Sequence, residues 1–399
     1  MDLQQDIPRL LGLELAPLLE LTRTYQGAGW QCYLVGGALR DMLLGLKPQD
    51  FDFATDAPLE ESRRLFKKVI PTGAKHGTVT ILLQGKGYEV TRLRRDVETD
   101  GRHARVIFTH SLTEDQARRD LTINALALDL TSFALADSQG GWADLKAKRI
   151  RFVGCAAERI REDQLRALRY LRYLARFRPL GFAQDPQEMQ EVVAVFDPSP
   201  LSMERILDEF QKIFAHPESD LEFLRGALPP LRLFRRFLGA EAETACLQAL
   251  LTLRHPLPLV VFAAQAGANL QELRLPKNLI RLGKTLAQTA GDWADDYTLK
   301  TLLGQVPLPE LPLASQAVEA IWQVPTLVRM QGFLARGEAL HLADLSITPY
   351  ELQTLGLKGR ELGQMQQLLL RHLYLHPAAN NPTQLKALAR ELAGKGFLP

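Results

Sequence analysis

Residues 33–55 read Tyr33-Leu-Val-Gly-Gly-Ala-Leu-Arg-Asp-Met-Leu-Leu-Gly-Leu-Lys-Pro-Gln-Asp-Phe-Asp-Phe-Ala-Thr55. An apolar strand leads into Gly36 and Gly37, and a second predicted strand carries Asp50 and Asp52. Because residues i and i+2 of a strand point to the same face, the two carboxylates are expected to point together while the phenylalanines face the core. Two oxygen ligands suit Mg²⁺, which binds one or two carboxylates together with substrate phosphates. The glycines leave room for a triphosphate to approach the backbone N–H groups. The pattern therefore predicts a metal-dependent nucleotidyl-transfer site.

Neither half of this pattern is specific alone, because Asp-x-Asp is common and Gly-Gly usually marks a turn. The combination of strand, Gly-Gly, Arg-Asp, short helix, glycine turn and Asp-x-Asp is much more specific. It resembles the head domain of the class II tRNA nucleotidyltransferase and bacterial poly(A) polymerase family, within the polymerase-β-like superfamily. The first motif of that family, Leu-x-Gly-Gly-x-x-Arg-Asp followed by Asp-x-Asp, is matched at Leu34, Gly36, Gly37, Arg40, Asp41, Asp50 and Asp52. The resemblance implies that Asp50 and Asp52 are catalytic and hold the metals.

The bulk properties of the chain are those of an ordinary globular protein. A chain of 399 residues exceeds the size at which a single core keeps growing, so several domains are expected. No apolar run approaches the roughly 20 residues of a membrane span. The N-terminus lacks the basic and apolar segments of a secretion signal, and the three cysteines form no zinc or redox motif. These features predict a cytoplasmic protein with no membrane partner.

The charge is unevenly distributed, although the formal net charge is only +2. Residues 144–178 contain 11 Lys or Arg and four Asp or Glu. Such a stretch forms either a solvated helix face or a surface for phosphates.

The residue patterns predict a mixed α+β head followed by helices. Polar residues 92–110 are expected to form a mobile loop, and residues from about 156 onward are expected to be helical. The resemblance implies a head, neck, body and tail, which we place at 1–153, 154–215, 216–312 and 313–399. In the head we expect helices over 8–30, 38–45, 58–68 and 112–127, and strands over 31–36, 50–54, 79–83, 88–91 and 149–153.

A second motif, Arg118-Arg-Asp-Leu-Thr-Ile-Asn-Ala125, falls early in the predicted helix 112–127. The two guanidinium groups can neutralise a triphosphate, Asp120 can accept from ribose hydroxyls, and Asn124 can contact sugar or base. The alternative is a set of surface ion pairs, which contribute little. The stretch matches the second motif of the family, Arg-Arg-Asp-x-Thr-x-Asn-Ala.

A third motif is Glu162-Asp-Gln-Leu-Arg166-Ala-Leu-Arg169. On one helix, Glu162 and Asp163 would lie four and three residues before Arg166, which also fits a plain ladder of ion pairs. A carboxylate beside a guanidinium complements the amino donor and ring acceptor of cytosine and adenine, and it opposes guanine and uracil. The family's Glu-Asp-x-x-Arg motif is assigned this role, so the resemblance implies that Asp163 and Arg166 read the base while Glu162 supports Arg166.

Further residues complete the predicted site. Residues 202–206, with Glu209 and Lys212, resemble a neck motif that braces the base-reading helix. Glu89 is either a third carboxylate of the site or half of an ion pair on a strand face. The nucleotide-binding residues implied are Gly36, Gly37, Arg40, Arg118, Arg119, Asp120, Asn124, Glu162, Asp163, Arg166 and Arg169.

The sequence thus predicts template-independent addition of CCA to the 3′ end of tRNA, with CTP, ATP and Mg²⁺. Addition of CC alone, addition of A alone, and poly(A) synthesis remain alternatives. The presence of residues 92–110 favours full CCA addition, because loss of this loop is associated with CC-only members of the family. An alternative of another class is a non-catalytic RNA-binding protein on a degenerate head. The sequence does not determine the oligomeric state.

Overall fold

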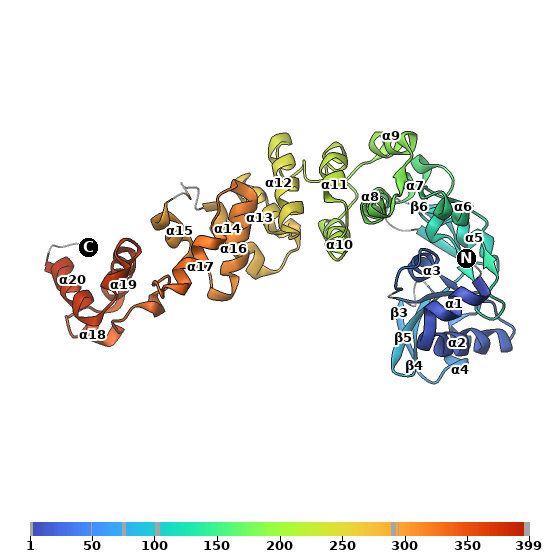
Figure 1. Ribbon diagram of the computed structural model, residues 1–399, viewed down its shortest axis with the longest axis horizontal. Coiled ribbons are helices and arrows are strands. Elements are labelled where there is room, and N and C mark those ends of the chain that lie inside the picture. The colour runs from blue at the N-terminus through green and yellow to red at the C-terminus, as the bar shows by residue number, and fades with distance from the viewer. Residues whose placement is uncertain are drawn as a thin grey trace. The chain divides into compact units, whose positions relative to one another are not determined.

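The computed structural model describes residues 3–48, 50–73, 77–99, 104–288, 293 and 295–394. The chain forms two compact units, Met1–Leu231 and Arg232–Pro399. In the described part of the chain, strands occur only in the first unit, and helices alone follow them (Figure 1). This is the predicted order of a mixed head followed by helices. The four domain boundaries drawn from the sequence remain predictions.

The first unit is built on a sheet in the order β3-β4-β5-β2-β1-β8-β9. Strand β2 pairs parallel with β5, and the other neighbours in this sheet pair antiparallel. The strands are β1 (Cys32–Val35), β2 (Asp52–Thr55), β3 (Val69–Gly73), β4 (Thr78–Leu83), β5 (Lys86–Arg92), β8 (Ala127–Leu128) and β9 (Leu135–Ala136).

Two smaller pairs of strands lie outside this sheet. Strand β6 (Arg94–Thr99) pairs antiparallel with β7 (Ala104–Phe108), and β10 (Arg149–Ile150) pairs parallel with β11 (Ala183–Gln184). We call β6 and β7 together the ribbon.

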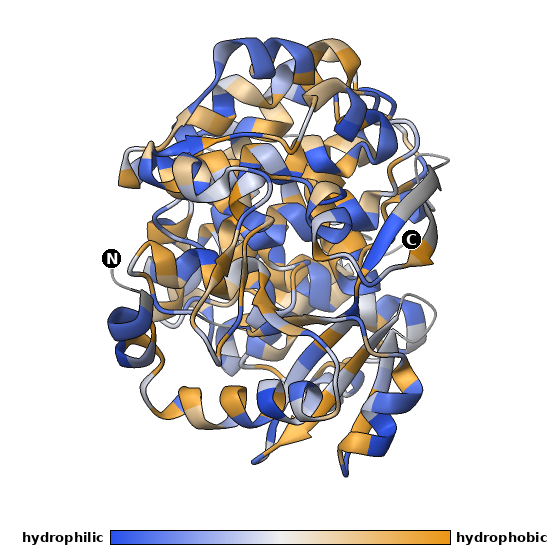
Figure 2. Ribbon diagram, turned by 90° about the vertical axis from the view of Figure 1, so that its right-hand side faces the viewer, coloured by the Kyte–Doolittle hydropathy of each residue, from blue (hydrophilic) through white to orange (hydrophobic). Residues whose placement is uncertain are grey.

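Helices complete the first unit. Several of these helices carry both hydrophobic and hydrophilic residues along their length, as expected of helices that bury one face (Figure 2). They are α1 (Leu3–Leu11), α2 (Leu15–Gly27), α3 (Gly36–Leu43), α4 (Leu59–Leu65), α5 (Leu112–Ala117), α6 (Gly141–Lys146), α7 (Ala156–Glu162), α8 (Leu165–Phe177), α9 (Pro186–Val195), α10 (Met203–Phe214) and α11 (Leu221–Ala227).

Helices are the only regular secondary structure among the described residues of the second unit. Part of its core is a cluster of buried side chains that includes Leu352, Met365, Leu369 and Leu385. No helix among the described residues of the whole chain is long and apolar enough to cross a membrane. The helices of this unit are α12 (Ala240–Leu253), α13 (Leu257–Gln265), α14 (Lys277–Gln288), α15 (Asp296–Leu303), α16 (Leu311–Trp322), α17 (Leu327–Ala335), α18 (Pro349–Gln353), α19 (Gly359–Leu375) and α20 (Pro382–Gly394).

Two expectations for the head were wrong because longer-range hydrogen bonds override local pattern. The predicted loop 92–110 contains the two paired strands of the ribbon. A hydrogen bond from Thr109 N to Leu93 O joins the residues that flank the ribbon, and we call this end its foot. The predicted helix 112–127 ends at Ala117, because Thr122 N bonds to Arg151 O and residues 127–128 join the sheet.

Two further expectations needed adjustment. The predicted helix 8–30 is divided at Gly12, whose φ of +52° does not belong to a right-handed helix. The predicted final strand 149–153 is shortened to Arg149–Ile150, and it pairs with β11 instead of joining the main sheet.

Candidate active site

A cavity of about 910 Å³ in the first unit gathers most of the residues that the sequence singled out. Glu162 is not part of its wall, but it contacts Arg166, which is. The wall also includes Asp115, Arg172, Tyr173, Arg176 and Arg205. The predicted residues in the wall are Gly36, Gly37, Arg40, Asp50, Asp52, Arg118, Arg119, Asp120, Asn124, Asp163, Arg166 and Arg169.

The carboxylates stand at the start of β2. Asp52 is the first residue of the strand and lies opposite Glu89 of β5, whereas Asp50 lies just before the strand that was predicted to include it. Phe51 and Phe53 are 6% and 0% exposed, so both face the core as expected. The wall therefore presents the Asp50, Asp52 and Glu89 carboxylates around the start of β2.

The backbone at Gly36 comes close to these carboxylates. Gly36 begins α3 directly after β1 with a φ of +75°, and a Cβ built there would lie 3.4 Å from Asp52 Oδ2. A residue other than glycine would be strained in this conformation. The glycine thus permits the turn that brings the start of α3 against Asp52.

The charges around Asp52 suit a cation. Burial, followed by the neighbouring Glu89 and Asp50 carboxylates, raises the pKa of Asp52 to about 6, while Arg119 acts in the opposite direction. Among the described residues, no group of three or more His, Cys, Asp or Glu side chains could hold a metal. Two carboxylates are nevertheless enough for an ion that takes its remaining ligands from water and substrate phosphates. The donor set fits Mg²⁺ in that mode.

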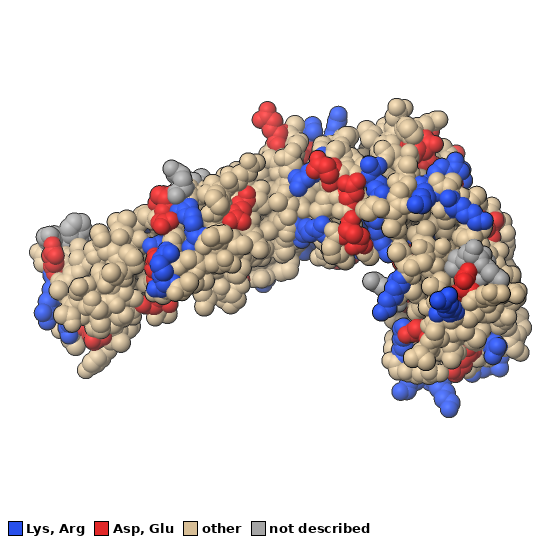
Figure 3. All heavy atoms as spheres, in the orientation of Figure 1, with Lys and Arg blue, Asp and Glu red and all other residues tan. Residues whose placement is uncertain are grey.

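Helix α8 supplies a basic wall to the cavity. Its arginines at 166, 169, 172 and 176 recur at helical spacing and all line the cavity, whereas Leu168 and Leu171 are buried in the core. On the face shown in Figure 3, Lys and Arg side chains gather over the region of α6–α8.

The rest of the basic stretch 144–178 is used differently. Arg149 and Arg151 pair with the buried Asp144, and Lys148 Nζ donates to Leu180 O. Part of the stretch therefore supports the fold, and the four arginines of α8 face the cavity.

The second motif is held by mutual contacts. Asp120 accepts from Arg169 Nε at 2.6 Å, and Asn124 Oδ1 accepts from Arg40 Nη1 at 2.6 Å. Burial alone would raise the pKa of Asp120, but the Arg169 guanidinium and other donors hold it well below its usual range. These residues thus connect the head to α8, and their predicted contacts with a nucleotide remain predictions.

Arg40 is the most enclosed of the predicted ligands. It is 2% exposed, its Nε and Nη2 donate to Asp41, and its guanidinium lies 4.8 Å from the Tyr173 ring centroid and 5.1 Å from that of Phe177. Asp41 also pairs with Arg176 at 2.9 Å. The first motif is therefore tied to α8 through this arginine.

The third motif is not on one helix, contrary to expectation. Helix α7 ends at Glu162, Asp163 has extended backbone angles, and α8 begins at Leu165. The predicted contact of Glu162 with Arg166 is present at 2.5 Å. Asp163 instead accepts from Arg205 Nη2 with both carboxylate oxygens, at 3.0 and 2.9 Å. Asp163 and Arg166, the predicted base-reading pair, are therefore held by different residues: Arg205 holds Asp163 and Glu162 holds Arg166.

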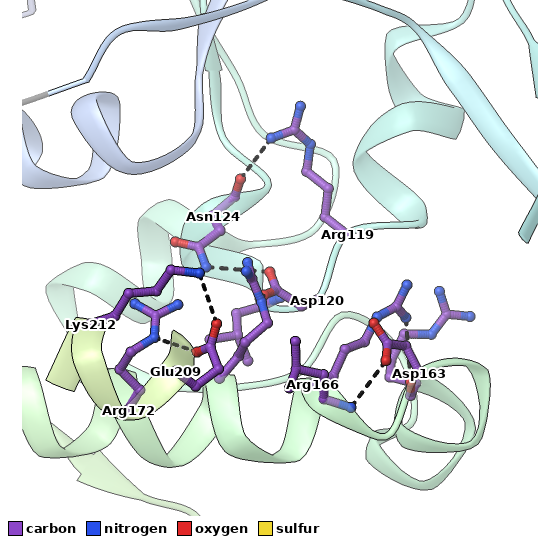
Figure 4. Close-up of polar contacts among 12 residues, drawn as sticks. Arg119, Asp120, Asn124, Asp163, Arg166, Arg172, Glu209 and Lys212 are labelled. Atoms are coloured by element: carbon purple, nitrogen blue, oxygen red, sulfur yellow. Dashed lines mark hydrogen bonds and ion pairs between the residues drawn. The ribbon is translucent and has the colours of Figure 1, made fainter. Parts of the chain in front are cut away.

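Helix α10 braces this region from the other side. Glu209 accepts from Arg172 at 2.7 Å and pairs with Lys212 at 3.1 Å (Figure 4). Together with Arg205, these contacts agree with the bracing role predicted for 202–206, Glu209 and Lys212. Asp115 was missed by the sequence reasoning, although it stands three residues before Arg118 and accepts from both arginines of the second motif.

Comparisons with known proteins decide the family. Residues 32–151 match the family model described as the poly A polymerase head domain. The CCA-adding enzyme of Streptococcus gordonii is 34% identical over 361 residues, which cover 87% of this chain and 86% of that enzyme. The chain belongs to the CCA-adding enzyme family. The resemblance and the fold class inferred from the sequence are thereby confirmed.

Other members show how far the similarity extends. The human mitochondrial CCA tRNA nucleotidyltransferase 1 is 40% identical over 212 residues, 52% of this chain and 49% of that enzyme. The chain thus spans about half the length of several curated relatives that it matches. The crystal structure of Bacillus stearothermophilus CCA-adding enzyme in complex with CTP has a TM-score of 0.72 and 26% identity, covering 96% of this chain and 98% of that chain.

Proposed function

We propose that this protein adds C, C and A in turn to the 3′ end of tRNA, using CTP and ATP and no nucleic-acid template. The observation that carries the proposal is the cavity itself. Carboxylates that suit a metal, two arginines that suit a triphosphate, and the Asp163 and Arg166 side chains all line it. The similarity to a CCA-adding enzyme solved with CTP supports the choice of nucleotide.

Asp50 and Asp52 would hold Mg²⁺. When bound, such ions activate the RNA 3′-hydroxyl and stabilise the pyrophosphate leaving group. Metal dependence is expected of the family, and the identity of the ion as Mg²⁺ is part of our proposal. The backbone at Gly36 and Gly37 would accept the triphosphate, and Arg118 and Arg119 would neutralise its charge.

Selection of the base follows from donor and acceptor order. The Asp163 carboxylate accepts from the amino group of cytosine or adenine, and the Arg166 guanidinium donates to the neighbouring ring nitrogen. Guanine and uracil present the reverse order and leave both protein groups facing like partners. Because Arg205 and Glu162 hold the two side chains independently, the pair can discriminate without a template base.

Full CCA addition is favoured over the narrower activities because the chain retains residues 92–110, which include the ribbon; Arg94 at the start of the ribbon lines the cavity. CC-only addition, A-only addition and poly(A) synthesis are the nearest alternatives. A non-catalytic RNA-binding role is disfavoured, since Asp50, Asp52 and the arginines are all present in one cavity. The cytoplasmic location remains a prediction.

One experiment separates these activities. The purified protein is given tRNAs that lack CCA, end in one C or end in CC, each with CTP, ATP or both, and product lengths are read. Extension of all three to CCA is expected. Products that stop at CC, additions of A alone, or long A tails each identify one alternative, and no pyrophosphate release with any tRNA identifies the non-catalytic one.

A further inference from the structure

Asp115 of α5 is the carboxylate at which the two arginines of the second motif meet. Its side chain is 1% exposed. Oδ1 accepts from Arg118 Nε and Nη2 at 2.9 and 2.6 Å, and Oδ2 accepts from Arg119 Nε and Nη2 at 3.2 and 2.9 Å. Each oxygen thus holds one guanidinium by two donors, a geometry that fixes direction as well as distance.

These contacts determine which N–H groups remain for a ligand. Both arginine side chains are 17% exposed and line the cavity that contains Asp50 and Asp52. Arg119 Nη1 donates to Asn124 O at 3.2 Å, whereas Arg118 Nη1 has no hydrogen-bond partner among the described residues. Asp115 thereby orients the free edge of Arg118.

The same carboxylate also holds the foot of the ribbon. Arg94 N donates to Asp115 Oδ1 at 3.3 Å, and Arg118 Nε donates to Arg94 O at 3.1 Å. Arg118 O in turn accepts from Arg166 Nη2 at 3.2 Å. Both backbone groups of the first ribbon residue are therefore fixed by the ion pair that orients Arg118.

We propose that Asp115 is a positioning residue that aims Arg118 and Arg119 at the triphosphate of the incoming nucleotide without touching it. The inference rests on the proposed function, because it takes these arginines as triphosphate ligands. It makes a prediction of definite sign. Neutralising Asp115 adds net positive charge near the phosphates, so charge alone would tighten triphosphate binding. Positioning predicts the opposite, because untethered arginines must lose side-chain freedom when they bind.

The test compares affinities for CTP and CMP in Mg²⁺ by titration calorimetry, using the full chain. In Asp115→Asn, the preference for CTP over CMP should fall about tenfold, or about 1.4 kcal/mol, while the affinity for CMP stays unchanged. Asp144→Asn is the matched control, since Asp144 is also fully buried and pairs with two arginines but does not line the cavity. It should keep the wild-type preference.

An unchanged or larger preference for CTP in Asp115→Asn, or an equal fall in Asp144→Asn, would overturn the inference. If Asp115→Asn does not fold, Asp115→Glu decides, because it keeps the charge but displaces both arginines. A reduced preference supports positioning, and a wild-type preference refutes it. Failure of the proposed function is separately visible, since the wild-type protein would then not extend tRNA or would bind CTP no better than CMP.

Discussion

Arg205 holds the carboxylate of Asp163, and its replacement by methionine should weaken the choice of CTP over UTP. Both oxygens of Asp163 accept from the same guanidinium nitrogen, at 3.0 and 2.9 Å. Methionine keeps much of the apolar stem of arginine, so packing changes little, and it removes the nitrogen that donates to both oxygens. Asp163 would then be free to turn away from the amino group of the base or toward Arg166.

The size of the effect follows from exposure. The Arg205 and Asp163 side chains are 32% and 29% exposed, so their pair lies between an exposed ion pair and a buried charged hydrogen bond. We therefore assign it about 1 kcal/mol. If Arg205 acts on the base only through Asp163, the CTP-to-UTP ratio of kcat/KM should fall about fivefold. The ratio should fall less in Arg205→Lys, because lysine keeps a cation that can donate to Asp163.

The assay is the first addition to a tRNA that lacks CCA, with CTP and UTP measured separately. Arg178→Met is the matched control, because Arg178 pairs with Asp220 at 2.9 Å with exposures of 35% and 29% and does not line the cavity. It should leave the ratio unchanged. An unaltered ratio in Arg205→Met, or equal losses in both variants, would refute the role given to Arg205.

Three further outcomes are expected. Asp50→Ala or Asp52→Ala should abolish nucleotide transfer in Mg²⁺ while tRNA binding, measured by gel shift, persists; near wild-type turnover would remove the metal assignment. Replacing residues 96–103 by a Gly-Ser linker should spare the addition of both Cs and sharply slow the terminal A in a single-turnover assay, whereas equal losses would make the segment a support of the fold. Glu209→Ala should lower the free energy of unfolding in urea by about 3–5 kcal/mol, because Arg172 is left buried without its partner; a loss below 1 kcal/mol would contradict that pairing.

The fold of the head was largely predictable because its signals are local. Alternating apolar residues located β4 and β5, a short apolar run located β1, and Gly36 with Gly37 located the turn between β1 and α3. The ribbon was missed because β6 is mostly polar and the apolar residues of β7 are consecutive, so neither strand shows apolar alternation. Each strand is stabilised by pairing with the other, which a search for apolar alternation does not detect. The early end of α5 was missed for a similar reason, since the bond of Thr122 N to Arg151 O joins residues far apart in sequence.

The sequence predicted which residues belong to the site, but it did not always predict which residues contact one another. Spacing placed Glu162 beside Arg166, and that contact is present at 2.5 Å. The same reasoning placed Asp163 beside Arg166 on a continuous helix, yet the chain extends at Asp163 and directs the carboxylate to Arg205, 42 residues later. Separation along a helix predicts contacts only where the helix is unbroken, and no breaker residue marks the end of α7.

The first motif shows why a match to a sequence motif does not by itself distinguish residues that contact the nucleotide from residues that only support the fold. Arg40 and Asp52 belong to the same motif, but Arg40 is 2% exposed, with its guanidinium bonded to Asp41 and Asn124 and stacked on rings of α8. Removing it would leave Asp41 and Asn124 with unmet hydrogen bonds in a buried setting, which destabilises the join between head and α8 whether or not a nucleotide is bound. A loss of activity in an Arg40 variant therefore identifies a nucleotide contact only if its unfolding free energy is unchanged, whereas Asp50, which is exposed, can be tested by activity alone.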